Sequence, residues 1–160
     1  MSNLRRHYEK GLVYFVTTVA HEREPIFTNE KSCKIVLLTI EYFKLLFDYK
    51  VFAYCLMPDH VHLLIQPFGE YNLSYIMKMI KGSFARKINR YKNSTGPIWQ
   101  KRFYDEGIRD ATMLTQKIEY IHNNPIRKKL VSSLEEYPYS SYHWYFSNNK
   151  NILEIDQLTY

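Results

Sequence analysis

The chain has 160 residues, of which 46% are hydrophobic and 24% are charged. This length and composition suit one compact globular domain and exclude intrinsic disorder. No run of about 18 apolar residues could span a bilayer, and the first residues lack the apolar core of a signal peptide, so we expect a cytoplasmic protein without membrane contact.

The charge balance suggests a class of partner. The 22 Lys and Arg residues exceed the 16 Asp and Glu residues, which gives a net charge of +6, and the chain carries 15 tyrosines and 9 phenylalanines. Cations that contact phosphates and rings that stack on unpaired bases predict nucleic-acid binding. A soluble basic protein with an aromatic core would have the same composition.

The first half of the chain predicts a strand, a helix and a hairpin. Residues 12–19 carry β-branched and aromatic side chains on both faces, which is typical of a central strand. Asn29 is a suitable N-cap for a helix that has apolar residues at helical spacing and ends near Asp48. Residues 51–56 and 60–66 then predict two strands joined by a tight turn.

The second half predicts further helices around a short strand. A helix over residues 72–91 buries one apolar face and leaves a basic face outside. After a loop and a strand near 107–109, Asp110 can cap a third helix. We expect Pro125 to end that helix, because the residue before a proline disfavours helical backbone. Residues 137–146 predict a short aromatic helix packed on the body.

This order of elements predicts an α+β fold. It is the ferredoxin-like βαββαβ pattern with an antiparallel sheet, extended by a C-terminal helix that carries a tyrosine and by the short aromatic helix. We assign residues 1–147 to a single domain and residues 148–160 to a tail that is packed on the domain or trails from it. The two long helices should cover one face of the sheet, and helix 111–124 should partly cover the other.

Two histidines in the second hairpin strand share one face of the sheet. Because side chains of a strand alternate, His60 and His62 point to the same side and could hold one divalent cation. For an isolated His-x-His pair, a half-exposed strand is the more common explanation. The third helix adds to the pair, because Tyr120 and Asn124 lie four residues apart and share a helix face.

These four residues predict a metal-assisted nucleophile. The carbonyl oxygen of Asn124 can join two imidazoles in binding Mg²⁺ or Mn²⁺, and Gln116 is the alternative third ligand. A phenol is protonated at neutral pH and attacks poorly, so Tyr120 needs an activated phosphate. A bound cation would orient a DNA phosphate for in-line attack and leave Tyr120 joined to a 5′ phosphate, which a 3′ hydroxyl can later displace.

Four short motifs occur along the chain: MPDHVHLL at 57–64, WQKRFY at 99–104, YIHNNPIR at 120–127 and YSSY at 139–142. In this order they resemble the motifs of the REP-associated tyrosine transposases, a branch of the single-tyrosine HUH (His-hydrophobic-His) transposases. The resemblance spans nearly the whole chain. Asp59 departs from it, because asparagine is expected there, and this change would alter the charge at the metal site without removing a ligand.

The resemblance implies metal-dependent cleavage and joining of single-stranded DNA at a hairpin. It implies Tyr120 as the nucleophile and His60 and His62 as metal ligands, and it puts Asn124 at the position of the third ligand. We expect Mg²⁺ or Mn²⁺ as the cofactor and hairpin-forming single-stranded DNA as the partner. We prefer a monomer to a homodimer.

Cations from separate segments could gather around one cleft and bind DNA phosphates, and three neighbouring rings could stack on unpaired bases. The predicted DNA-binding residues are Arg5, Arg6, Lys78, Lys81, Trp99, Lys101, Arg102, Phe103, Tyr104, Arg127, Lys128 and Lys129. Alternatively, these rings belong to the core and the cations are merely solvated.

Two other functions fit the same residues. A domesticated, non-catalytic DNA- or RNA-binding module of the same fold would need only the sheet and its aromatic residues. A metal-dependent hydrolase would use the histidines with a bound water and leave Tyr120 idle. A covalent protein–DNA adduct would separate both functions from a transposase.

Overall fold

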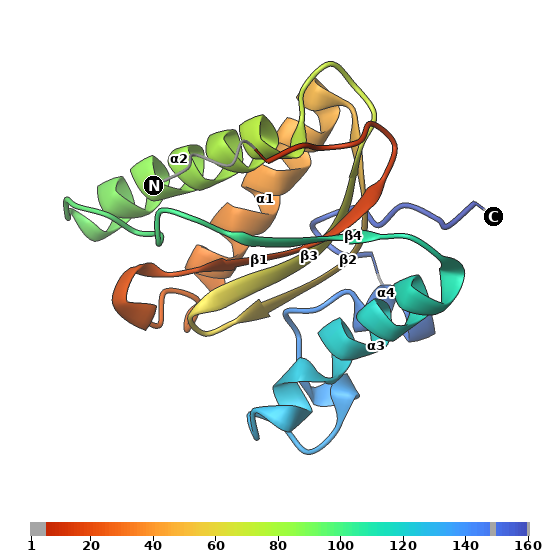
Figure 1. The fold of residues 1–160 in the computed structure, drawn as a ribbon. Coiled ribbons are helices and arrows are strands. Elements are labelled where there is room, and N and C mark those ends of the chain that lie inside the picture. Colours follow the sequence, from red (N-terminus) through yellow and green to blue (C-terminus); the bar gives the residue numbers. More distant parts are fainter. Residues whose placement is uncertain (1–5, 148–149, 160) are drawn as a thin grey trace.

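A computed structural model describes residues 6–147 and 150–159 (Figure 1). Its elements are β1 (Val13–Val19), η1 (His21–Arg23), α1 (Glu30–Phe47), β2 (Tyr49–Met57), β3 (His60–Pro67), α2 (Leu73–Lys92), β4 (Tyr104–Ile108), α3 (Ala111–Arg127), η2 (Leu134–Glu136) and α4 (Tyr142–Ser147), where η marks a 3-10 turn. The predicted α+β class and the order of its main elements are therefore confirmed.

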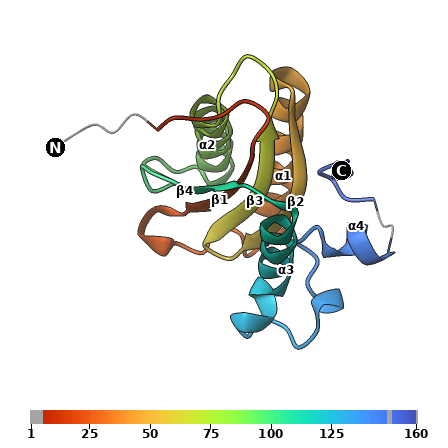
Figure 2. The same cartoon turned by 45° about the vertical axis from the view of Figure 1, so that its right-hand side comes forward.

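Helices lie on both faces of one sheet. α1 and α2 cover one face, and α3 lies against the other (Figures 1 and 2). Val61 and Ile65 of β3 enter the larger core beneath α1 and α2, whereas Leu64 enters a smaller core that also contains Ile121 of α3. This alternation turns His60 toward the α3 side, as the strand pattern predicts.

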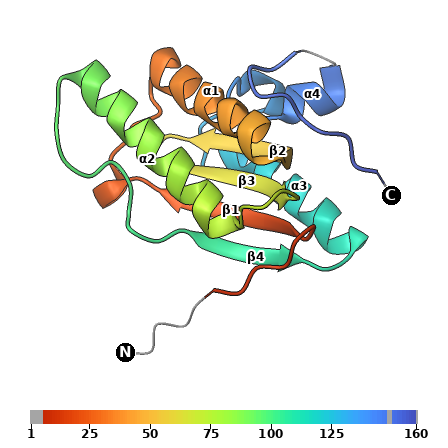
Figure 3. The ribbon, with the colours of Figure 1, turned by 90° about the horizontal axis from the view of Figure 1, so that it is seen from above.

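The four strands form one antiparallel sheet in the order β2-β3-β1-β4 (Figure 3). β1 is central, as its apolar residues on both faces predict. It pairs with β3 so that Thr17 lies opposite His62 and Val19 lies opposite His60. β4 is an edge strand that begins at Tyr104, earlier than the predicted short strand.

Side-chain caps begin the three long helices. The side-chain oxygens of Asn29, Asn72 and Asp110 each accept a hydrogen bond from the backbone N–H three residues later, at distances of 2.8 to 3.0 Å. Each bond satisfies one of the N–H groups that a helix start leaves without a partner. The caps at Asn29 and Asp110 are those that the sequence predicts.

The prediction that Pro125 ends α3 is wrong. The helix continues to Arg127 with Pro125 inside it. Proline lacks an N–H and leaves one carbonyl of the preceding turn without its helical donor. The last turn nevertheless closes, because the N–H of Lys128 donates to the carbonyl of Asn124 at 3.0 Å. Asn124 therefore stays helical and keeps the same face as Tyr120.

The C-terminal segment is less helical than predicted. The aromatic helix is only six residues long, Tyr142–Ser147, and Tyr137 lies outside it, with its hydroxyl donating to the carbonyl of Leu56. Further on, Leu153 and Ile155 are buried in the larger core. None of the helices within residues 6–147 and 150–159 has the length and apolar character of a membrane span.

A buried polar pair joins α3 to the C-terminal segment. Nε2 of His122 lies 2.8 Å from the hydroxyl of Ser141, which also accepts a hydrogen bond from the N–H of Tyr54 at 3.0 Å. Both side chains are buried. Burial lowers the pKa of His122 to about 4, so the ring is neutral at pH 7.

We predict that His122 makes the fold sensitive to acid. Below the unfolded pKa of about 6.5, the unfolded chain binds a proton that the folded chain excludes until the pH reaches about 4, and each such group reduces the free energy of unfolding by about 1.4 kcal/mol per pH unit. Between pH 7 and pH 5, the free energy of unfolding measured in urea should therefore fall by about 2 kcal/mol less in His122→Gln than in the wild type. Equal losses would contradict this role.

Candidate active site

His60, His62, Tyr120 and Asn124 meet at one cleft of about 440 Å³, between the sheet and α3. The residues that line it are Phe15, Thr17, Val19, Arg23, His60, His62, Tyr104, Lys117, Tyr120, Asn124 and Lys128. The structure thus brings together the four side chains that the strand and helix spacings select.

The two imidazoles point their outer nitrogens at each other. The Nε2 atoms of His60 and His62 lie 3.1 Å apart. Nδ1 of His60 lies 2.5 Å from a carboxylate oxygen of Asp59, and Nδ1 of His62 lies 2.8 Å from the hydroxyl of Thr17. These contacts favour tautomers that carry the hydrogen on Nδ1, which leaves both Nε2 lone pairs directed at the same point.

Both rings are neutral at pH 7. Burial lowers the pKa of His62 to about 3, and the charge of Arg127, together with that of His60 when His60 is protonated, acts in the same direction. Burial also lowers the pKa of His60, and it outweighs the opposing effect of the hydrogen bond to Asp59. Neutral imidazole is the form that binds a metal ion, so the pair is ready for one.

Asn124 completes a donor set of two nitrogens and one amide. Its amide nitrogen lies 2.7 Å from Nε2 of His62, and its oxygen is buried without a hydrogen-bond partner in the described part of the chain. A half-turn of the carboxamide exchanges the two atoms and brings the oxygen beside the imidazoles. A buried oxygen without a partner is unfavourable. A divalent cation between the imidazoles and the turned carboxamide would give the Asn124 oxygen a partner, so these three residues fit such a cation.

The alternative ligand and other donor types lie elsewhere. Gln116 is exposed and does not line the cleft. Among residues 6–147 and 150–159, no group of three His, Cys, Asp or Glu side chains is placed to hold a metal ion. The amide in contact with the histidine pair is that of Asn124, which makes it the candidate third ligand.

Tyr120 stands at the wall of the cleft among rings and cations. Its side chain is 37% exposed, and its ring centroid lies 5.6 Å from that of His62 and 5.7 Å from that of Phe15. The guanidinium carbon of Arg127 lies 4.1 Å from the ring centroid, and the ammonium of Lys117 lies 5.8 Å from it. The phenol is thus beside the histidine pair in surroundings that suit a phosphate.

Five residues of the cleft are not among the site residues predicted from the sequence: the apolar Phe15 and Val19, and the polar Thr17, Arg23 and Lys117. Thr17 and Arg23 come from β1 and from the turn after it, so their position depends on the pairing of β1 with β3. Lys117 lies three residues before Tyr120, and helical spacing alone would have found it.

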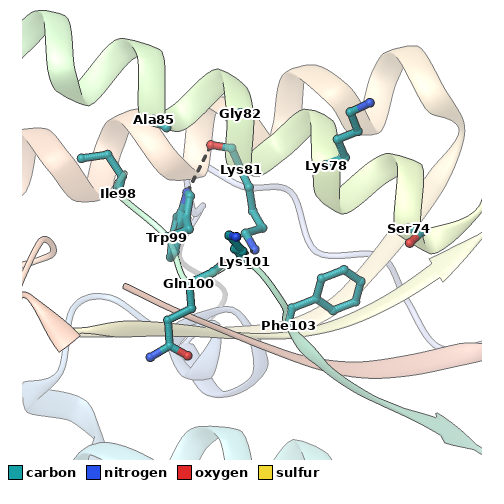
Figure 4. Close-up of a pocket in the computed structure, with 10 residues that line it drawn as sticks. All are labelled: Ser74, Lys78, Lys81, Gly82, Ala85, Ile98, Trp99, Gln100, Lys101 and Phe103. Carbon is teal, nitrogen blue, oxygen red and sulfur yellow. Dashed lines mark hydrogen bonds between the residues drawn. The ribbon is translucent and has the colours of Figure 1, made fainter. Parts of the chain in front are cut away.

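Several of the predicted DNA-binding residues line a second hollow, a groove of about 460 Å³ between α2 and residues 98–103 (Figure 4). These residues are Lys78, Lys81, Trp99, Lys101 and Phe103. Lys78 and Lys101 are exposed at this groove, whereas Lys81 is partly buried and donates to the carbonyl of Gln100 at 2.8 Å.

A third hollow of about 590 Å³ joins the other two. It shares Thr17, Val19 and Tyr104 with the cleft, and it shares Gln100 and Phe103 with the groove. The predicted residues Arg6 and Arg102 line it as well. These shared lining residues link the three hollows beside β4, and we refer to the three together as the trough.

Other predicted DNA-binding residues have different positions. Arg5 lies outside the described residues, and Lys129 is exposed but lines none of the three hollows. Trp99 is a core residue, because its ring packs on Phe27 and Phe84 at centroid distances of 5.8 and 5.3 Å. Its indole N–H donates to the carbonyl of Lys81 at 3.2 Å (Figure 4). Trp99 is therefore buried, and only the small part of its side chain that lines the groove can contact a ligand.

Known proteins resemble the chain in sequence and in fold. Residues 9–124 match the family described as "Transposase IS200 like". A protein of Haemophilus influenzae Rd, named as a candidate REP-associated tyrosine transposase, is 32% identical over 156 residues, which cover 89% of this chain and 86% of that protein. The REP-associated tyrosine transposase of Escherichia coli K12 is 28% identical over 146 residues, which cover 89% and 84%.

One solved structure matches nearly the whole fold. It is a REP-associated tyrosine transposase bound to a REP hairpin, and it superposes with a TM-score of 0.78 at 25% identity, covering 99% of this chain and 94% of that one. The match therefore includes the sheet, both long helices and α3.

We predict that Mn²⁺ stabilises the protein through the histidine pair. A ligand that binds only the folded state, at about 100 times its Kd, adds about 2.7 kcal/mol to the free energy of unfolding. Thermal melts should show a higher Tm with Mn²⁺ in the wild type and in His7→Ala, whose histidine is exposed and lies outside the cleft. His62→Ala should show no increase. An equal increase in His62→Ala would place the cation elsewhere.

Proposed function

The chain belongs to the IS200-like transposase family, and we propose that it cleaves and rejoins single-stranded DNA at hairpins through a 5′-phosphotyrosine intermediate. The observation that carries this proposal is a phenol beside two neutral imidazoles whose Nε2 atoms lie 3.1 Å apart. The hairpin-bound relative supports a DNA hairpin as the substrate.

Tyr120 would supply the attacking oxygen. A bond forms between the phenol oxygen and a DNA phosphorus, the bond to the 3′ oxygen breaks, the phenol loses its proton and the departing 3′ oxygen gains one. Mg²⁺ or Mn²⁺ held by His60, His62 and Asn124 would polarise a phosphate oxygen. Rejoining reverses this exchange: a 3′ hydroxyl attacks the phosphorus and the phenol oxygen of Tyr120 leaves. No ATP is needed, because the phosphotyrosine is itself a phosphodiester.

The cations near Tyr120 would hold the phosphate in place. Arg127 and Lys117 flank the phenol ring, and Lys128 lines the same cleft. Cationic donors in a partly buried site form strong hydrogen bonds with phosphate oxygens. A strand so bound would keep its phosphorus within reach of the phenol oxygen, and correct placement of reacting atoms is a large part of catalysis.

The trough gives the DNA a path away from the nucleophile. It leads from the cleft past Tyr104 to the groove, where Lys78 and Lys101 are exposed. Arg6 lies 4.6 Å from the centroid of the Phe103 ring and pairs with Asp105 at 2.7 Å. Cations spaced along a narrow hollow suit a single strand, whose phosphates they can follow.

We assign the βαββαβ core to the ferredoxin-like folds, with residues 1–147 as one domain and 148–160 as its tail. Of the two expected arrangements of the tail, its described contacts support the packed one, because the N–H of Asp156 donates to the carbonyl of Val51 at 2.9 Å. We propose that the protein works as a monomer with Mg²⁺ or Mn²⁺ as its cofactor.

We predict that Tyr120→Phe abolishes the covalent protein–DNA adduct and leaves hairpin binding within a few fold. The phenol oxygen takes part in the chemistry, whereas the ring packing against Phe15 and His62 is kept. Labelled single-stranded DNA from the flanks of the protein's own gene, incubated with Mn²⁺ and run on a denaturing gel, measures the adduct.

Tyr104→Phe is the matched control, because it removes another phenol oxygen from the same cleft and keeps the ring. This variant should form the adduct through Tyr120 as the wild type does. An adduct that persists in Tyr120→Phe would refute the assignment of the nucleophile. Hairpin binding by the wild type without any adduct would favour a domesticated binding module.

We predict that the trough determines the salt dependence of DNA binding. On a single strand, each phosphate that a cation of the protein neutralises contributes about 0.7 to the log–log salt slope. Lys101→Ala/Arg102→Ala should therefore show a slope shallower by about 1.4, whereas Lys34→Ala, which removes a cation paired with Glu30 on α1, should not. A wild-type slope in the double variant would move the DNA path elsewhere.

A further inference from the structure

The turn after β1 holds two residues in a left-handed backbone conformation. Glu22 has a φ of 51° and Arg23 a φ of 54°, a region that residues with a Cβ rarely adopt. The Arg23 side chain is 65% exposed and pairs with Asp59 at 3.0 Å. An exposed pair of this kind adds little stability, so stability alone does not account for the turn.

Backbone hydrogen bonds fix this turn against the tip of the β2–β3 hairpin. The N–H of Ala20 donates to the carbonyl of Asp59 at 2.8 Å, and the N–H of Phe27 donates to the carbonyl of Pro58 at 3.0 Å. These bonds enclose the left-handed residues on both sides. They hold Arg23 at the wall of the cleft.

One carboxylate connects this cation to the histidine pair. Oδ2 of Asp59 accepts a hydrogen bond from Nη1 of Arg23 at 3.0 Å, and Oδ1 lies 2.5 Å from Nδ1 of His60. Asp59 therefore orients a guanidinium and an imidazole at the same time. A carboxylate that accepts a hydrogen bond from the Nδ1–H of a histidine also makes Nε2 a better ligand for a cation.

Arg23 retains donors for a ligand. A guanidinium has five N–H groups in a planar fork, and within the described part of the chain it makes a single hydrogen bond, through Nη1. Its remaining groups can bind two oxygens of one phosphate side by side. The cleft that Arg23 lines also contains the phenol of Tyr120.

We infer that Arg23 binds the phosphate that Tyr120 attacks, and that Asp59 positions both Arg23 and His60. This inference rests on the proposed function and adds a substrate contact from outside the histidine strand and the tyrosine helix. The left-handed turn then holds the Arg23 guanidinium at the cleft that Tyr120 also lines, and each carboxylate oxygen of Asp59 contacts one partner, Arg23 or His60.

Two measurements separate the two roles. The first is the Kd for Mn²⁺ without DNA, from electron paramagnetic resonance titration. The second uses a labelled single-stranded oligonucleotide from the flanks of the protein's own gene: its affinity in EDTA by fluorescence anisotropy, and its single-turnover cleavage rate with saturating Mn²⁺. Thermal melts verify that each variant is folded.

Arg23→Ala should bind Mn²⁺ within about twofold of the wild type but bind the oligonucleotide about 10-fold more weakly and cleave it about 10- to 100-fold more slowly, as expected when a charged hydrogen bond is removed. Arg23→Lys should recover only part of the rate, because an ammonium lacks the fork. Asp59→Asn should instead bind Mn²⁺ about 10-fold more weakly.

Arg109→Ala is the matched control. Arg109 is also 65% exposed and pairs with the carboxylate of Glu9 at 3.0 Å, but it does not line the cleft. It should match the wild type in all three readouts. The double variant Arg23→Ala/Asp59→Asn should cleave more slowly than Asp59→Asn alone, because Arg23 contacts the phosphate directly.

Wild-type oligonucleotide affinity in Arg23→Ala would overturn the inference, as would a cleavage rate equal to that of the wild type. A double variant no slower than Asp59→Asn would reduce Arg23 to a positioning residue and overturn the direct contact. If the wild type forms no adduct, the proposed function fails, whereas the affinity in EDTA still tests the phosphate contact of Arg23.

Discussion

The contact between two buried, neutral imidazoles is the constraint on which the site depends. His60 and His62 meet through their Nε2 atoms, 3.1 Å apart, on the sheet face that α3 covers. Their Nδ1 atoms are held by Asp59 and by Thr17 of the neighbouring strand. Because the site lies on a sheet, two strands and a hairpin turn fix the direction of the lone pairs before any ligand binds.

α3 brings the remaining chemistry to that point. The helix packs on β2 and β3, and one turn separates Tyr120 from Asn124, so the phenol and the buried amide reach the histidines from the same side. This requires the helix to continue through Pro125. The hydrogen bond from the backbone N–H of Lys128 to the carbonyl of Asn124 closes the last turn there, and the guanidinium of Arg127, in that turn, lies over the phenol ring.

Much of the fold and part of the site could be predicted from the sequence. Strand alternation turns His60 and His62 to one face, and helical spacing puts Tyr120 beside Asn124, because both features are local. The prediction from Pro125 failed because the local rule, that a helix ends before a proline, is overridden here by backbone hydrogen bonds from residues 128–130 to the last turn of α3. The position of Arg23 could not be predicted, since it depends on the pairing of two strands far apart in the chain and on a left-handed turn that no glycine marks. Burial of Trp99 likewise depends on tertiary contacts, with Phe84 of α2 and with Phe27 in the turn before α1.

The central claim is that Tyr120 becomes covalently joined to DNA. It is tested most directly by mass spectrometry of the adduct formed with Mn²⁺ and single-stranded DNA from the flanks of the protein's own gene, after nuclease and trypsin digestion. Cleavage after Lys117 and Arg127 yields the peptide 118–127, in which Tyr120 is the one tyrosine. We predict a nucleotide 5′ phosphate on this peptide. A nucleotide on any other tyrosine, or none on the protein, would contradict the account.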